Sequence, residues 1–198
     1  MSKVICGISM SVDGFVAGAG QTEQQPFGDM PEDLLHHWMF DEPKKHRAEL
    51  DSLLAAGAFI MGRNMYGPAG ESYDKTWKGW WGDDPPYHAP VFVLTHRARE
   101  PVPMEGGTTF HFVTEGIHAA LEQARQAAGE KAVAIMGGAN TLNQYLAAGL
   151  VDELWLHIAP VTVGQGARLF ENVPNLRMEP ISVGGTSLVT HIKYRVLK

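Results

Sequence analysis

Three short segments of the chain place glycine or threonine next to residues that bind phosphate. Gly62-Arg63-Asn64, Thr95-His96-Arg97 and Gly137-Gly138-Ala139-Asn140 each follow a short apolar run. Glycine lets another molecule approach the backbone closely, and the guanidinium group of arginine binds phosphate oxygens as a bidentate fork. Two arginines and a histidine beside a backbone phosphate site suit a ligand that carries a pyrophosphate and one further phosphate, which is the shape of NADPH.

The Gly137-Gly138 pair is the most informative part of these segments. It lies between an apolar run at 133–136, which predicts a buried strand, and a helical pattern that starts at Thr141. The first amide groups of a helix have no intrahelical partner and attract phosphate. The alternative is a plain tight turn, which two glycines also favour. The chain has no G-x-G-x-x-G and no P-loop sequence, which argues against an ordinary dinucleotide-binding domain and against an NTPase.

The elements that must position these segments alternate between strand and helix patterns. This order predicts an α/β fold, with a mainly parallel sheet, an antiparallel C-terminal edge and helices on both faces. The carboxyl ends of parallel strands open on one edge of a sheet, so we expect the three segments to lie side by side there. Helical spacing follows Pro31, Pro43 and Glu115, and strand patterns cover 3–10, 58–62, 91–95, 108–114, 133–136, 153–159 and 188–196.

Length and composition limit the class of protein. With 198 residues we expect one domain over 1–198, large enough to bury a core. The net charge of -6 gives no electrostatic reason to expect nucleic acid or an anionic membrane, and no apolar run reaches the length of a membrane span. The single cysteine, Cys6, lies in an apolar run and favours a reducing compartment, so we expect a cytoplasmic protein.

Two acidic residues are candidates for substrate chemistry. Asp13 belongs to an Asp13-Gly14 turn directly after the first strand, where active-site loops are common. Asp33 falls in the first turn of the helix predicted after Pro31. Each has a structural alternative, since Asp-Gly is a frequent turn and an acid in a first helical turn contributes about 0.3 to 1 kcal/mol through the helix dipole.

Two other groups of side chains leave more than one interpretation open. Trp80 and Trp81 can stack on a flat heterocycle, cover a dimer contact or pack over the edge of the sheet. His36, His37 and His46 lie near several acids, but they lack a metal-binding spacing. We expect these histidines to be solvated side chains on helix faces, and we expect no metal site.

The motifs, in this order, resemble those of the dihydrofolate reductase-like superfamily. Within it the chain is most similar to the reductase domain of the riboflavin-biosynthesis deaminase-reductase and to its stand-alone bacterial relatives. The likeness covers nearly the whole chain, and Gly-Gly-Ala together with Gly-Leu-Val-Asp-Glu-Leu is its most specific part. It rests on Ser-Val-Asp-Gly at 11–14, Met-Gly-Arg-Asn-Met-Tyr at 61–66, Val-Leu-Thr-His-Arg at 93–97, Met-Gly-Gly-Ala-Asn-Thr-Leu at 136–142, Gly-Leu-Val-Asp-Glu-Leu at 149–154 and His-Ile-Ala-Pro at 157–160.

This resemblance implies NADPH as hydride donor, a homodimer and a role for each motif. Ser9, in the first strand, is expected against the nicotinamide amide. The remaining cofactor contacts are Gly62, Arg63 and Asn64 at the phosphates, Thr95, His96 and Arg97 at the adenosine 2′-phosphate, and Gly137, Gly138, Ala139, Asn140 and Thr141 at the pyrophosphate.

The resemblance also assigns catalytic roles to the two acids. Met30-Pro-Glu-Asp-Leu is similar to the helix start where folate reductases carry their substrate carboxylate, which gives that role to Asp33. Asp13 falls in the loop that closes over the cofactor. Leu156 stands where the folate enzymes have a threonine, so folate itself is not the expected substrate.

The expected function is therefore an NADPH-dependent reductase that transfers a hydride to a small heterocyclic or ribosylamino-pyrimidine substrate. The implied activity is similar to that of 5-amino-6-(5-phosphoribosylamino)uracil reductases. A sparse set of polar residues is compatible with it, because hydride transfer mainly needs orientation and exclusion of water. Three alternatives stay open: a dihydrofolate reductase-type pteridine reductase, a non-catalytic NADPH-binding protein and a flavin-dependent oxidoreductase.

Overall fold

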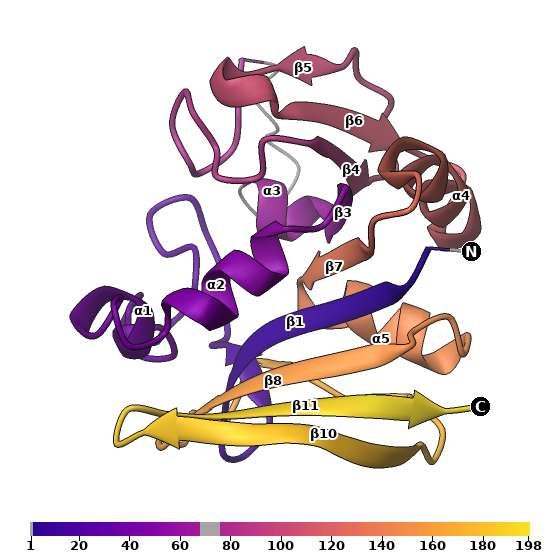
Figure 1. The fold of residues 1–198 in the computed structure, drawn as a ribbon. Coiled ribbons are helices and arrows are strands. Elements are labelled where there is room, and N and C mark those ends of the chain that lie inside the picture. The colour runs from indigo at the N-terminus through magenta and orange to yellow at the C-terminus, as the bar shows by residue number, and fades with distance from the viewer. Residues whose placement is uncertain (1, 68–75) are drawn as a thin grey trace.

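The computed structural model describes residues 2–67 and 76–198. Nine strands form one sheet in the order β10-β11-β8-β1-β7-β3-β4-β6-β5 (Figure 1). Two short strands, β2 (Phe15–Ala17) and β9 (Ala167–Arg168), pair separately. The strands of the large sheet are β1 Val4–Ser11, β3 Ala58–Gly62, β4 Pro90–Leu94, β5 Val102–Pro103, β6 Thr109–Val113, β7 Val133–Gly137, β8 Glu153–Ala159, β10 Arg177–Thr186 and β11 Val189–Leu197.

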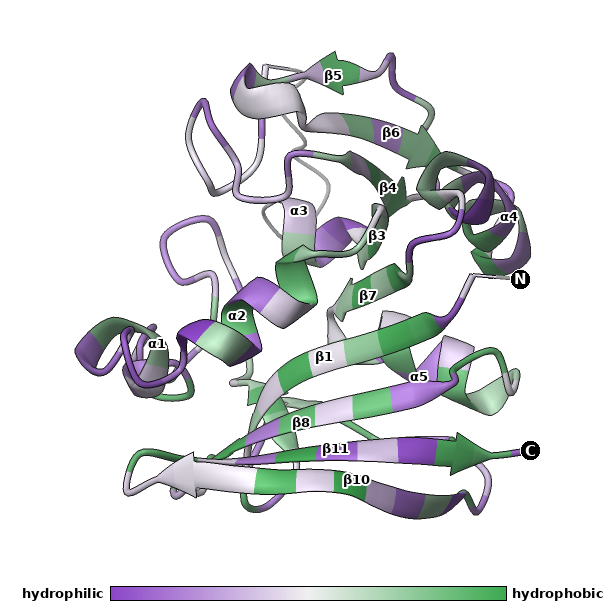
Figure 2. Cartoon of the chain, in the orientation of Figure 1, coloured by the Kyte–Doolittle hydropathy of each residue, from purple (hydrophilic) through white to green (hydrophobic). Residues whose placement is uncertain are grey.

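The strands from β8 to β6 are mutually parallel, and β11 and β10 continue the sheet antiparallel at one edge. At the other edge, β5 is antiparallel to β6. The predicted sheet, mostly parallel with an antiparallel C-terminal edge, is confirmed. Apolar residues dominate the central strands β1 and β7, whereas polar and apolar residues mix along β10 and β11 (Figure 2). This difference follows from burial on both faces at the centre and on fewer faces at the edge.

Helices cover both faces of the sheet, as the sequence predicts. On one face, α4 and α5 bury their apolar sides in a core that includes Cys6 and Ile135. On the other face, Leu53 of α2 packs in a second core with Phe59 and Trp155. No helix within the described ranges is long and apolar enough to cross a membrane. The helices are α1 His37–Asp41, α2 Arg47–Leu54, α3 Arg63–Tyr66, the 3₁₀ helix Glu105–Gly107, α4 Ile117–Ala128 and α5 Ala139–Ala147.

The helix predicted after Pro31 begins later than expected. Residues 32–36 form consecutive turns, in which the amide of His36 donates to the carbonyl of Asp33, and α1 starts at His37. Asp33 is therefore not in the first turn of an α-helix, and that part of the prediction is wrong. Leu35 and Trp38 are both buried, but they pack against different parts of the fold. This tertiary packing outweighs the local helical pattern.

The strand β10 is the largest element that the sequence pattern does not reveal. It contains Pro180, Gly184 and Gly185, which interrupt any alternation of polar and apolar residues. Its strand conformation comes from antiparallel pairing with β11 along its whole length. A strand whose conformation depends on pairing with another strand carries no local sequence signal from which it can be predicted.

Candidate functional site

The three segments that are predicted to bind phosphate meet at the carboxyl ends of neighbouring strands. β7, β3 and β4 are adjacent in the sheet, and Gly137, Gly62 and Leu94 end them. The junctions also touch, because a Cβ atom added to Gly62 would lie 2.4 Å from the hydroxyl of Thr141 at the start of α5. The predicted clustering of these segments on one edge of the sheet is thus what the fold produces.

Gly137 and Gly138 are glycines for different reasons. Gly137 has a φ of +128°, which other residues rarely adopt, and a Cβ there would crowd Ile8 and Met65. Gly138 has a φ of −74° and a ψ of −170°, and a Cβ there would meet nothing within 4 Å. The φ and ψ of Gly138 are open to other residues and no described atom fills the position of its Cβ, although the peptide bond that joins it to Gly137 is cis. The backbone at Gly138 therefore faces open space.

The start of α5 has further features that suit a phosphate group. Gly138 is the N-cap of this nine-residue helix and no side chain caps it. Of the residues expected there, Asn140 is exposed, whereas Ala139 and Thr141 are buried and offer their backbone. An uncapped helix start next to open space fits a pyrophosphate, since its amide groups and the helix dipole both favour negative charge.

The basic residues lie around the ends of β3 and β4. Arg63 is half-buried and its guanidinium donates to the side-chain oxygen of Asn64 at 3.3 Å. The hydroxyl of Thr95 accepts the backbone amide of Arg97 at 3.2 Å, which shapes the turn that carries His96. His96 and Arg97 are exposed. Both arginines therefore lie on the same edge of the sheet as Gly138.

Asp13 holds two loops together. Its carboxylate accepts the hydroxyl of Ser11 at 2.6 Å and the backbone amides of Val163 and Gly164 at 3.1 and 2.8 Å. The hydrogen bond from Ser11 is the largest cause that lowers the pKa of Asp13; burial opposes it, and the bonds from the backbone amides lower the pKa further. A carboxylate held in this way favours the charged form and positions the loop after β1. It is poorly suited to donate a proton.

Asp33 lies at the carboxyl end of β8. Its segment is anchored by Met30 and Leu35, which pack against Ala159, the last residue of that strand. The side chain of Asp33 is exposed, and its carboxylate lies 3.7 Å from the imidazole of His37. Asp33 therefore presents a carboxylate beside the strand end where the acceptor is expected, whereas the carboxylate of Asp13 is already engaged.

The tryptophans lie over the other half of the sheet. Trp81 packs on Tyr87 and stacks on Phe110 of β6, with ring centroids 5.3 and 6.0 Å apart. Trp80 contacts Trp77 edge to face at 4.6 Å. Since β6 is separated from β1 by three strands, Trp81 packs over the sheet and is remote from the strand that should hold the nicotinamide. This packing favours the third interpretation of Trp81, in which it packs over the edge of the sheet.

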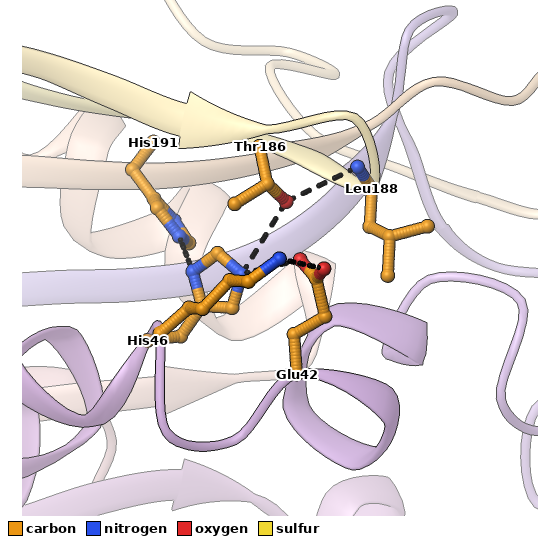
Figure 3. A network of polar contacts seen from close by, with 6 residues as sticks. Glu42, His46, Thr186, Leu188 and His191 are labelled. Carbon is orange, nitrogen blue, oxygen red and sulfur yellow. Dashed lines mark hydrogen bonds and ion pairs between the residues drawn. The ribbon is translucent and has the colours of Figure 1, made fainter.

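A buried histidine cluster is the feature that sequence reasoning missed. His46, His157 and His191 are each at most 5% exposed and surround the ring of Trp38. The expectation that His46 is solvated is wrong, because β11 supplies it with a hydrogen-bond partner (Figure 3). The alternation of β11 points the other way, since it places His191 with Lys193 and Arg195 on the polar face, and His191 is buried because His46 and Trp38 cover it.

The cluster lies on the face of β8 that carries α1 and α2. Leu156, the departure from the folate enzymes, points into the core on the α5 side. Its neighbour His157 pairs in register with Ser9 of β1, so these two side chains lie next to each other on the opposite face. No group of three or more His, Cys, Asp or Glu side chains in the described part of the chain is arranged to hold a metal ion.

Comparison with known proteins places this geometry in a family. No curated protein sequence matches the chain. Among solved structures, a putative riboflavin biosynthesis protein from Shewanella sp. PV-4 is similar, with a TM-score of 0.68 and 22% identity over 100% of both chains. A Thermotoga maritima diaminohydroxyphosphoribosylaminopyrimidine deaminase/5-amino-6-(5-phosphoribosylamino)uracil reductase has a TM-score of 0.59 and 11% identity, over 99% of this chain and 57% of that one.

The riboflavin biosynthesis reductase Rib7 of Saccharomyces cerevisiae is also similar, with a TM-score of 0.55 and 13% identity over 100% of this chain and 89% of that one. At these identities the solved structures show the shared fold. The sequence family is shown separately, because the model of the RibD C-terminal domain matches residues 2–190. The chain therefore belongs to the RibD C-terminal domain family, within the dihydrofolate reductase-like superfamily that its motifs resemble.

Proposed function

We propose that this chain is an NADPH-dependent reductase of a ribosylamino-pyrimidine, similar to 5-amino-6-(5-phosphoribosylamino)uracil reductases. The observation that carries the proposal is Gly138. This glycine stands at an uncapped helix start, with open space before it and two arginines on the same sheet edge. Family membership supports the reaction class, and the name of the Thermotoga maritima protein supports the substrate class.

In this proposal each group of residues has a defined task. Bound NADPH would supply a hydride. The backbone at 137–141 binds the pyrophosphate, Arg63 and Arg97 bind the 2′-phosphate, and Ser9 contacts the nicotinamide amide. Asp33 holds the acceptor and helps to protonate it, and Asp13 fixes the loop between β1 and β2. These tasks amount to binding, orientation and exclusion of water, which supply most of the catalysis in such a reaction.

The reaction is tested by steady-state oxidation of NADPH with 5-amino-6-(5-phosphoribosylamino)uracil, with dihydrofolate in parallel. Turnover of the uracil compound alone supports the proposal. Turnover of dihydrofolate alone would favour the pteridine reductase, and tight NADPH binding without turnover of either would favour a non-catalytic binding protein. A yellow protein with bound flavin would instead indicate a flavin-dependent oxidoreductase.

NADPH should bind more tightly than NADH. Hydrogen bonds to charged groups contribute about 1.5 to 3 kcal/mol, so Arg63→Ala or Arg97→Ala should weaken NADPH by roughly 10- to 100-fold and change NADH little. Titration calorimetry with both cofactors measures this difference. Arg177→Ala, at an exposed arginine on the edge strand β10, is the matched control and should change neither affinity. Equal affinities of the unmutated protein for NADPH and NADH would contradict the assignment.

A further inference from the structure

The buried histidines form a hydrogen-bonded chain with a defined direction. Nδ1 of His157 and Nδ1 of His191 are 2.7 Å apart, and Nε2 of His191 and Nδ1 of His46 are 2.8 Å apart. Each of these two links holds one proton. If each ring carries one proton, the third proton sits at one end of the chain, either on Nε2 of His46 or on Nε2 of His157.

The outer end of the chain decides where that third proton sits. Nε2 of His46 is 3.4 Å from the hydroxyl oxygen of Thr186 and 3.6 Å from a carboxylate oxygen of Glu42 (Figure 3). Hydrogen bonds from Lys45 and then from the Thr186 hydroxyl lower the pKa of Glu42. An ionised carboxylate can only accept hydrogen bonds, so Glu42 beside Nε2 of His46 favours a proton on that nitrogen, and the oxygen of Thr186, which accepts the amide of Leu188, can accept from it as well.

The tautomers of the other rings follow in sequence. With the proton on Nε2 of His46, His191 must donate from Nε2 and His157 must donate from Nδ1. Nε2 of His157 is then left without a proton. Burial, and then the nearby His191 and Lys193, lower the pKa of His157 to about 3, so the ring stays neutral near pH 7.

This bare nitrogen points to the strand that should hold the nicotinamide. β8 lies between β11 and β1, and His157 is in register with His191 on one side and with Ser9 on the other. Because Nδ1 is turned to His191 of β11, Nε2 lies on the side of the ring that faces β1, the strand that carries Ser9. Within the described residues, neither Nε2 of His157 nor the hydroxyl of Ser9 has a hydrogen-bond partner, although both residues are at least nine-tenths buried.

We propose that His157 and Ser9 form a binding site for an amide group of a ligand, in which the amide N–H donates to Nε2 of His157 and the amide oxygen accepts from Ser9. Glu42 acts on this site from a distance as a positioning residue, because it sets the direction of the histidine chain. The inference rests on the proposed function, which supplies two possible amides: the carboxamide of NADPH and the ring amide of the uracil.

The test breaks the chain at its middle ring. In His191→Phe, His157 loses the partner that holds its proton on Nδ1, and Nε2 then becomes a donor that faces the ligand donor. We expect about 10- to 100-fold weaker binding of NADPH if the carboxamide is the ligand, or of 5-amino-6-(5-phosphoribosylamino)uracil if the ring amide is. Adenosine 2′,5′-bisphosphate, which has no amide to donate, should bind with unchanged affinity.

A spectroscopic measurement tests the direction of the chain without any ligand. In ¹⁵N-histidine spectra of the unmutated protein we expect His157 as the neutral Nδ1–H tautomer. Glu42→Met removes the carboxylate without touching the ring pair at the site, and it should shift His157 towards the Nε2–H tautomer and weaken the same ligand. Trp38→Phe, which alters a ring packed on all three histidines but no nitrogen in the chain, is the packing control and should preserve the tautomer and the affinity.

The outcomes separate this inference from the proposed function. If NADPH and the bisphosphate bind the unmutated protein but His191→Phe and Glu42→Met leave both amide ligands unaffected, the amide site is wrong and the reductase proposal stands. An Nε2–H tautomer of His157 in the unmutated protein also overturns the amide site. If neither NADPH nor the bisphosphate binds the unmutated protein, the proposed function fails and the assignment of these amides fails with it.

Discussion

Gly138→Val should abolish NADPH binding while the domain remains folded. The backbone angles of Gly138, −74° and −170°, are open to valine, and the new side chain would meet no protein atom within 4 Å of its Cβ. It would instead occupy the space before the start of α5, where the pyrophosphate has to approach the amide groups. We expect a loss of more than about 100-fold in affinity, measured by calorimetry, with unchanged circular dichroism and thermal melting.

Two other glycines provide the controls for this experiment. A Cβ at Gly184, on the exposed strand β10, also meets nothing within 4 Å, so Gly184→Val should change neither folding nor binding. Gly137 has a positive φ, so Gly137→Val should lose stability as well as binding. If a folded Gly138→Val protein bound NADPH normally, the assignment of the pyrophosphate to this junction would be wrong.

Asp33→Asn should reduce turnover by the order of 10² to 10⁴ that is typical of an acid-base group, with NADPH affinity nearly constant. The reason is position, since the exposed carboxylate of Asp33 is held beside the end of β8 by the packing of Leu35 on Ala159. Single-turnover oxidation of NADPH with the uracil substrate measures the effect. Asp41 is the matched control, because its carboxylate also contacts His37, at 3.2 Å, and Asp41→Asn should leave turnover unchanged.

Asp13→Asn, measured in parallel, should act mainly on the loops. An amide side chain has only one oxygen to accept the bonds that Asp13 now receives from Ser11, Val163 and Gly164, so we expect a lower melting temperature. If Asp33→Asn kept full activity and Asp13→Asn lost activity at unchanged stability, the catalytic acid would be assigned to the loop that carries Asp13. Full activity of both variants would leave water or the substrate as the proton source.

The fold was predictable where short segments carry their own pattern. Apolar runs such as 58–62 and 133–136 specify buried strands, and the spacing from Ile117 to Ala128 specifies the helix α4. The alternation of these elements then specifies a parallel sheet. The start of α1 and the strand β10 were not predictable, because the packing of Trp38 and the pairing with β11 decide them.

The sequence by itself determined which residues meet at the sheet edge where we propose that phosphate binds. Gly62, Arg63, Arg97 and Gly138 follow strands that a parallel topology brings to the same side, and family membership is consistent with that order. The cofactor and the homodimer stay predictions, which the cofactor titrations above and a measurement of molecular mass in solution address. The cytoplasmic location also stays a prediction.

Only the tertiary structure decided what each polar group near β1 is free to do. The carboxylate of Asp13 accepts a hydrogen bond from a backbone amide 150 positions away along the chain, and His46 is hydrogen-bonded to His191, which is 145 positions away. Local periodicity encodes the direction of a side chain relative to its own strand or helix, but it does not encode the partner that a distant segment brings. The hydrogen bonds that occupy Asp13 and that orient His157 therefore become visible only when β8, β11 and the loops at the end of β1 are assembled.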